Sequence, residues 1–272
     1  MDRTETTALP LAFVEPHKFL LQQPATGALL FKIVRVRHLI DMLQRNYLHF
    51  QRVDAYGDDK TDGEQLPLDR VTGAAMSLEK DPQFTLERYY DTARARTYAC
   101  CFSQEHNSYL WENYAPDRDA VCLVFDFDKL RARLNATLQA TLENPGLLVQ
   151  GANTFRQIFS INYGIVQYVD RQTHALHMAN PIQFTFLKDK ARFENERELR
   201  VALSALGIGQ FVLENGAAMG FPPALKMAFD FREAFSTGTI TELCCPPEFV
   251  DASHLATIQR EMGNLRITPV TL

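Results

Sequence analysis

A cluster of charged residues that runs directly into an apolar segment constrains this chain more than any other feature. Residues 193–200 contain three glutamates and two arginines, and the apolar residues 201–203 follow at once. If this segment forms a strand, the alternation of side chains places Glu196, Glu198 and Arg200 on one face. The sequence therefore predicts either a site built from two carboxylates and a counter-ion, or a solvated sheet edge.

Short segments with strand-like and helix-like patterns alternate along the 272 residues. Strands are expected at 27–34, 47–50, 98–103, 121–127, 159–168, 199–203, 239–244 and 265–270, and helices at 37–46, 81–94, 108–115, 127–142, 181–190 and 251–262. This mixture predicts an α+β fold with a mixed, largely antiparallel sheet and peripheral helices. We expect a single domain over residues 29–272, preceded by an N-terminal extension over residues 1–28.

Local signals refine these expectations at several boundaries. Asp81 before Pro82 predicts a helix start, because the carboxylate can accept from free amides and proline presets the backbone. Asp126 or Asp128 is expected to cap the helix at 127–142. The polar residues 54–64 predict a loop or a mobile cover, and this segment is the best candidate for a lid. The Gly- and Pro-rich residues 207–223 are expected to cross the surface.

Composition excludes several classes of protein. The net charge of −5 and a pI near 5.8 give no extended basic surface for nucleic acid, although Arg35, Arg37, Arg45 and Arg52 can form a local basic patch. No window approaches the roughly 20 apolar residues of a membrane-spanning helix, and the N-terminus does not read as a secretory signal. The five cysteines, which include two adjacent pairs, predict reduced, partly buried thiols and a cytoplasmic location.

Three blocks of sequence occur in an order and spacing typical of one bacterial family. The blocks comprise residues 30–32 with 48–50, then 101–103, Ser108, 111–114 and 121–125, and finally 166–169, Lys188 and 193–200. On these blocks the chain resembles the domain of unknown function 2971 family, from about residue 29 to the end. It departs from the family after the second short strand, where residues 56–59 replace an Asn-Asp-Pro-like turn. The resemblance brings no activity with it.

The order of the parts is also similar to the layout of the ADP-ribosyltransferase superfamily, whose members use NAD as a substrate. That resemblance implies that Lys32 or Arg35 holds the phosphates, that Ser103 supports the ribose or the carboxylate, and that Glu198 is the catalytic carboxylate. Glu196 would then orient the nucleophile. A fixed carboxylate suits this chemistry because the ribose gains oxocarbenium character as nicotinamide leaves.

Further residues around these blocks have two interpretations each. Trp111 and Tyr114 can form a wall of a nucleotide pocket, but aromatic residues at this spacing are more often core. Arg200 can bind a nucleotide or hold Glu198 in place. The charged cluster can equally be a ladder of exposed ion pairs on a sheet edge, joined by Arg94 or Arg96, and such pairs contribute below ~1 kcal/mol each.

Three classes of function stay open from the sequence. The first is a nucleotide-binding enzyme that transfers ADP-ribose from NAD to an unidentified target. The second is a non-enzymatic sensor or partner-binding module in stress or phage defence. The third is a hydrolase or nuclease that uses Glu196, Glu198 and Asp58 on a divalent cation, although the histidines and cysteines show no metal-binding spacing. Ser103 and His106 also suggest a nucleophile and base, without a third orienting group.

Overall fold

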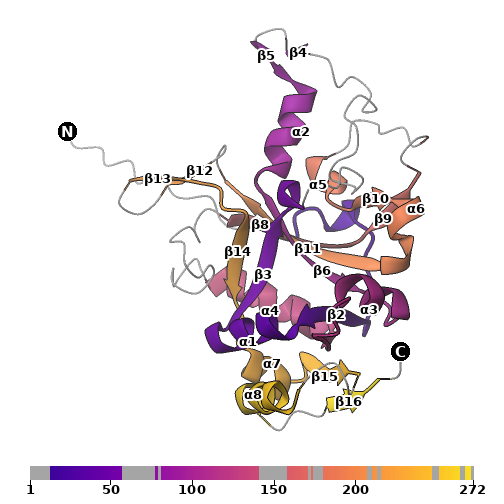
Figure 1. Ribbon diagram of the computed structural model, residues 1–272. Helices are drawn as coiled ribbons and strands as arrows, with labels where there is room; N and C mark the ends of the chain where they lie inside the picture. Colours follow the sequence, from indigo (N-terminus) through magenta and orange to yellow (C-terminus); the bar gives the residue numbers. More distant parts are fainter. Residues whose placement is uncertain are drawn as a thin grey trace, which may run out of the picture.

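A ten-stranded sheet runs through the part of the chain that this computed structural model describes (Figure 1). The described residues are 13–56, 77–78, 81–140, 158–170, 173, 180–206, 210–212, 216–246, 251–263 and 267–270. The strands of the sheet are β1 (Phe13–Val14), β2 (Leu29–Arg35), β3 (Tyr47–Arg52), β6 (Thr97–Ser103), β7 (Ala120–Asp126), β8 (Ile158–Ile165), β11 (Glu198–Ala205), β14 (Ala224–Ala228), β15 (Ile240–Cys245) and β16 (Ile267–Pro269).

The sheet is mixed and mostly antiparallel, which confirms the predicted α+β class. Its main order is β1-β8-β11-β6-β2-β7-β15-β16, while β3 bridges β6 and β14. Only the outer pairs β1/β8 and β15/β16 are parallel among the described strands of this sheet. Three two-stranded sheets accompany it: β4 (Ser77–Leu78) with β5 (Asp81–Thr85), β9 (Gln167–Val169) with β10 (Leu187–Asp189), and β12 (Gln210–Val212) with β13 (Ala218–Gly220).

The sheet divides at β6, and this division positions the functional site. The C-terminal end of β6 pairs with β2 through Ser103 and Phe31, whereas its N-terminal half pairs with β3 through Ala99 and Tyr98. In Figure 1, β2 and β3 run in clearly different directions. The segment of β6 between the two pairings therefore faces the opening between β2 and β3.

Helices cover the sheet and bury a continuous apolar core. They are α1 (Val36–Arg45), α2 (Leu86–Arg94), α3 (Ser108–Tyr114), α4 (Phe127–Ala140), α5 (Pro181–Phe184), α6 (Lys190–Phe193), α7 (Phe231–Ser236) and α8 (Ala252–Met262). Figure 1 shows α1, α7 and α8 together at one end of the molecule and α2 at the opposite end. Helix α1 buries four apolar side chains and ends at Asn46, whose left-handed φ of 50° stops the helix.

Side-chain caps explain where several helices begin. Asp126 accepts a hydrogen bond from the amide of Lys129 at 3.0 Å and so caps α4, as expected for one of the two candidates. Asp128 instead accepts from the amide of Gly27. Asn107 caps α3 in the same way, through the amide of Leu110.

The N-terminal segment is held by the sheet and by α4. Strand β1 pairs in parallel with β8, and Glu15, which follows it, accepts hydrogen bonds from Arg131 and Asn135 of α4. Part of the segment that precedes residue 29 is thus integrated into the sheet. None of the helices within the described ranges is both long and apolar enough to span a membrane.

The helix predicted to follow Asp81 and Pro82 through Arg94 starts later than expected, and the helix predicted at 181–190 is wrong beyond its first turn. Asp81 and Pro82 begin strand β5, and the helix starts only at Leu86, because proline at the start of an edge strand is as compatible with the backbone as proline at a helix start. Residues 181–190 form one helical turn, α5, and then strand β10, because the turn closed by the Asn180 capping box is followed by pairing with β9. Strand β14 and helix α7 were not predicted.

Two predicted loop segments and the cysteines complete the comparison of the fold with the sequence. The lid predicted at 54–64 lies mostly outside the described residues; its first part is a 3-10 turn, Val53–Ala55, followed by Tyr56. The segment at 207–223 contains strands β12 and β13 as well as loop. All five cysteines are free thiols, and four of them are buried.

Candidate functional site

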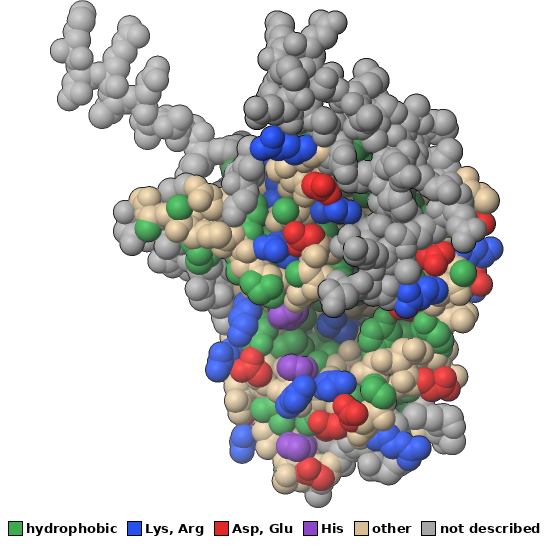
Figure 2. All heavy atoms as spheres, turned by 45° about the horizontal axis from the view of Figure 1, so that its top comes forward, with side chains coloured by type: hydrophobic (Ala, Val, Ile, Leu, Met, Phe, Trp, Pro, Cys, Tyr) green, Lys and Arg blue, Asp and Glu red, His purple; other side chains and the backbone are tan. Residues whose placement is uncertain are grey.

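A cavity of about 350 Å³ opens where β2 and β3 part from β6. One wall comes from β2 and β6, through Phe31, Lys32, Ile33 and the segment Cys101-Phe102-Ser103. The start of β11 and strand β10 supply the charged lining residues, and Tyr56 and Tyr114 also line the cavity. Figure 2 shows a hollow on this face with hydrophobic side chains inside it and Lys, Arg and His side chains beside it. The site therefore combines an apolar wall with a charged wall.

Strand register brings three of the predicted site residues to this cavity. Ser103 lies opposite Glu198 on one side of β6 and opposite Phe31 on the other, and Lys32 is the next residue of β2. Lys32, Ser103 and Glu198 all line the cavity. Main-chain pairing of three strands, rather than loop conformation, sets their relative positions.

Lys32 occupies the gap in the sheet. Its Nζ donates to the carbonyl oxygen of Cys101 at 2.9 Å and lies 5.1 Å from the centre of the Phe102 ring. No carboxylate of the described residues lies within ion-pair distance of this half-buried ammonium group. An ammonium group carries three donors, so Lys32 retains donors for an anionic group in the cavity.

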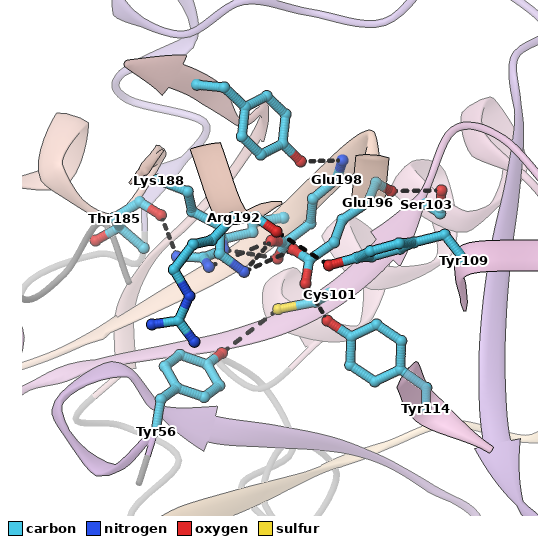
Figure 3. A network of polar contacts seen from close by, with 12 residues as sticks. Tyr56, Cys101, Ser103, Tyr109, Tyr114, Thr185, Lys188, Arg192, Glu196 and Glu198 are labelled. Carbon is cyan, nitrogen blue, oxygen red and sulfur yellow. Dashed lines mark hydrogen bonds and ion pairs between the residues drawn. The ribbon is translucent and has the colours of Figure 1, made fainter. Parts of the chain in front are cut away.

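The charged wall is a buried network of two carboxylates and two cations (Figure 3). Lys188 Nζ lies 2.7 Å from Glu196 Oε2 and 3.1 Å from Glu198 Oε2. Arg200 donates from Nε to Glu198 Oε1 at 2.7 Å and from Nη1 to the carbonyl oxygen of Thr185 at 2.7 Å. The four side chains are between 1% and 6% exposed. Because each charge contacts an opposite charge, the network can exist away from water.

This burial overturns the interpretation of the cluster as a solvated sheet edge. Strand β11 lies between β8 and β6, so it is an interior strand. Arg197 points outward, and its exposed side chain lies 3.7 Å from Glu105. The suggested partner Arg94 instead pairs with Asp91.

Glu196 does not lie on the strand, contrary to the expectation from alternation. It ends a 3-10 turn, Glu194–Glu196, and Arg197 follows with a left-handed φ of 47°. Ser103 Oγ fixes this turn by lying 2.6 Å from the carbonyl oxygen of Glu196, and it is also 2.7 Å from that of Glu105. The turn returns Glu196 to the same side as Glu198 even though it breaks the strand pattern.

Tyrosine and cysteine side chains complete the network. The Tyr114 hydroxyl donates to Glu196 Oε1, and the Tyr56 hydroxyl lies 3.4 Å from Cys101 Sγ. Burial and the neighbouring Glu198 carboxylate raise the pKa of the Cys101 thiol, so this thiol stays protonated at neutral pH. Tyr168 accepts from the backbone amide of Glu198 at 2.8 Å.

Two predicted binding residues lie away from the cavity. Arg35, at the far end of β2, pairs at 3.1 Å with Asp117. Trp111 is buried in the core and donates from Nε1 to His106 Nε2 at 2.8 Å. His106 is also stacked on Phe31, which lines the cavity, so Trp111 lies behind the wall. Of the phosphate-binding candidates, Lys32 alone lines the cavity.

The structure also bears on two alternative chemistries. Ser103 Oγ contacts the backbone of Glu105 and Glu196, and within the described residues it has no hydrogen bond to His106. The ammonium of Lys188 occupies the position between Glu196 and Glu198 that a divalent cation would need. Asp58, the third suggested ligand, lies outside the described residues, and the described ones contain no group of three possible ligands for a metal ion.

Lys188, Tyr56 and Cys101 line the cavity but were not predicted as site residues. Lys188 lies on a three-residue strand, which is too short to show periodicity. Its position in the third block of the family resemblance was the only sequence signal for it. Cys101 and Tyr56 reach the cavity through the division of the sheet, for which the sequence carries no recognisable pattern.

Comparison with known proteins adds little to this geometry. No protein-family model matches the chain, and no curated protein matches it. Among solved structures, the chain is similar to DarT of Thermus sp. 2.9 in complex with ADP-ribosylated ssDNA, with a TM-score of 0.35 and 9% sequence identity over 92% of this chain and 97% of that one. A likeness this distant carries no argument, so the site must be interpreted from its own residues.

Proposed function

We propose that this cavity binds NAD and that the protein transfers ADP-ribose from it to an acceptor. The observation that carries the proposal is the arrangement of Lys32, Ser103 and Glu198 around one cavity, with Glu198 fixed by Lys188 and Arg200. The resemblance of the sequence layout to that of the ADP-ribosyltransferase superfamily agrees with this proposal.

Glu198 supplies the electrostatic part of the reaction. As the bond between ribose C1′ and the nicotinamide nitrogen breaks, its electron pair leaves with nicotinamide and positive charge develops on the ribose. A carboxylate already held by Arg200 and Lys188 can stabilise that charge without reorganising. The acceptor then forms a new bond to C1′ and loses a proton. Glu196, beside the Tyr114 hydroxyl, is the base that orients the acceptor.

Lys32 and the aromatic wall account for binding. The available donors of Lys32 suit a phosphate oxygen, and the rings of Phe31 and Phe102 suit a flat heterocycle. Ligand pockets usually measure roughly 300–1,000 Å³. A cavity of about 350 Å³ is at the small end of this range. We therefore assign it to the reacting nicotinamide and ribose half of NAD.

Thermal melting with and without excess NAD tests binding, beside ADP-ribose, ATP, Mg²⁺ and Mn²⁺. A ligand at a hundredfold excess over its dissociation constant stabilises the folded state by roughly 2.7 kcal/mol. We expect NAD and ADP-ribose to raise the melting temperature, and Lys32→Met to remove most of that shift. Release of nicotinamide from NAD then measures turnover.

Glu198→Gln tests the catalytic assignment, with Glu15→Gln as the matched control. Both side chains are carboxylates that accept hydrogen bonds from an arginine. Glu15 accepts from Arg131 of α4 and lies outside the cavity. Glu198→Gln is expected to abolish nicotinamide release, whereas Glu15→Gln retains it in the folded protein. If no nucleotide shifts the melting temperature, the partner-binding module becomes the better interpretation, and a shift with divalent cations alone favours the hydrolase.

A further inference from the structure

Lys188 occupies the centre of the charged wall without belonging to the main sheet. It lies on β10, which pairs in parallel with β9, and its register partner there is Tyr168. Tyr168 in turn accepts a hydrogen bond from the amide of Glu198. The small sheet β9/β10 thus approaches the first residue of β11 with two side chains, one of which contacts the backbone and the other the carboxylate.

The ammonium of Lys188 is surrounded by its partners. It contacts Glu196 Oε2 and Glu198 Oε2, and it lies 4.4 Å from the centre of the Phe193 ring. The side chain is 6% exposed. The ammonium group of Lys188 donates to two carboxylates and also faces an aromatic ring. Lys32 differs, because its described hydrogen bond is to one carbonyl oxygen. Lys188 therefore suits holding protein groups better than holding a substrate phosphate.

Charge balance explains why this position needs a cation. Glu196 and Glu198 bring two negative charges into a site with almost no contact with water, where like charges repel strongly. Arg200 contacts Glu198, whereas Glu196 contacts Lys188 and the Tyr114 hydroxyl. Lys188 is thus the group that joins the two carboxylates and lets both face the cavity.

We infer that Lys188 is a positioning residue for the proposed reaction, which fixes Glu196 and Glu198 relative to each other at the cavity. This inference rests on the proposed transfer of ADP-ribose from NAD. It assigns Lys188 no contact with the reacting atoms. Its effect is on the placement of the carboxylate that stabilises the ribose and of the one that orients the acceptor.

The test is the rate of nicotinamide release by Lys188→Met and Lys188→Arg, at a temperature where melting curves show each variant folded. Misplacement of catalytic groups by about 1 Å can cost on the order of 100-fold in rate. We expect kcat of Lys188→Met to fall at least about tenfold while KM changes less than about threefold, the pattern of a lost transition-state interaction. Lys188→Arg keeps the charge and is expected to retain more of kcat than Lys188→Met.

Arg131→Met is the control, since it breaks the ion pair with Glu15 away from the cavity and should leave kcat within about threefold of wild type. Folded Lys188→Met with a wild-type kcat, or with an unchanged kcat and a raised KM, would overturn the inference. If Lys188→Met does not fold, Lys188→Gln takes its place, since it also removes the charge, and a folded Lys188→Gln with a wild-type kcat overturns the inference. A wild-type protein that neither binds nor cleaves NAD overturns the proposed function at an earlier step, and the inference with it.

Discussion

Glu198 and Ser103 are direct partners in the antiparallel pairing of β11 with β6. Their relation is therefore a property of strand register, and a shift of one residue would turn Glu198 to the other face of the sheet. Ser103 adds a second connection, because its hydroxyl group contacts the carbonyl oxygen of Glu196. Ser103 thus holds the turn that carries Glu196, and it is the register partner of Glu198.

Ser103→Ala should destabilise the protein through this turn. The variant leaves the buried carbonyl oxygen of Glu196 without its hydrogen bond, at a cost of about 1–3 kcal/mol. Urea denaturation measures the loss. Ser236→Ala is the matched control, since this exposed serine donates to the carbonyl oxygen of Glu233 and its removal should cost less than about 0.5 kcal/mol. Equal effects of the two substitutions would show that Ser103 does not hold the turn.

Glu198→Gln should lower stability whatever the function of the site. The substitution removes one negative charge from a buried network and leaves Lys188 and Arg200 with less compensation. Breaking a buried pair in this way costs on the order of 3 kcal/mol. Chemical denaturation at neutral pH should show this loss. An unchanged free energy of unfolding would mean that Glu198 is more hydrated than its 4% exposure indicates.

Gly164→Ala should disturb the arrangement that supports β10. A Cβ atom at Gly164 would lie 2.8 Å from Cδ1 of Phe186 and 3.2 Å from Cβ of Leu21. Overpacking of a buried site typically costs about 1–3 kcal/mol. Phe186 lies two residues before Lys188 in the chain, so the clash would act close to β10. We expect a lower melting temperature, which Phe186→Leu in the same chain should partly restore by opening space. Additive losses in the double variant would contradict the steric explanation.

Fluorescence of Trp111, the single tryptophan, can report the protonation state of His106. Burial lowers the pKa of His106, and the hydrogen bond from Trp111 needs an unprotonated Nε2. Because the folded pKa lies below the unfolded one, the unfolded chain binds a proton first as the pH falls below about 6.5, so stability decreases with falling pH. Fluorescence of Trp111 should stay constant through pH 6.5 and change only below it.

His106→Gln supplies the comparison for that titration. A glutamine has no proton to gain over this pH range, so the emission of Trp111 in this variant should be independent of pH between about 7 and 5. The same titration curve in both proteins would place the transition elsewhere in the molecule.

The sequence predicted the class of fold and most interior strands, because their apolar runs are long enough to show a pattern. The prediction was wrong where one sequence pattern is compatible with two kinds of secondary structure. Asp81 followed by Pro82 is compatible with the start of a helix or of a strand. Here the segment forms strand β5 because it pairs with β4, which consists of Ser77 and Leu78. The strand that carries Lys188 is three residues long and depends on its contact with β9, which no local pattern records.

The candidate site was predictable only in part, for a similar reason. Glu196 and Glu198 were found because their charges cluster in sequence, and Ser103 and Lys32 because of the layout they resemble. Their common cavity depends on the division of the sheet at β6, which arises from pairing between distant strands. The roles of these residues in binding or catalysis remain predictions for the experiments above.

The division of the sheet also has a consequence for how the protein is made. Strands β2 and β6 are synthesised early, whereas β11, which carries Glu198 and Arg200 between β6 and β8, emerges from the ribosome much later. Until then β6 has an unpaired edge beside the future cavity, which still lacks Glu196, Glu198 and Arg200. A nascent chain is thus unable to form the site before most of its sheet is complete, and folding of β11 both closes the exposed edge and assembles the charged wall.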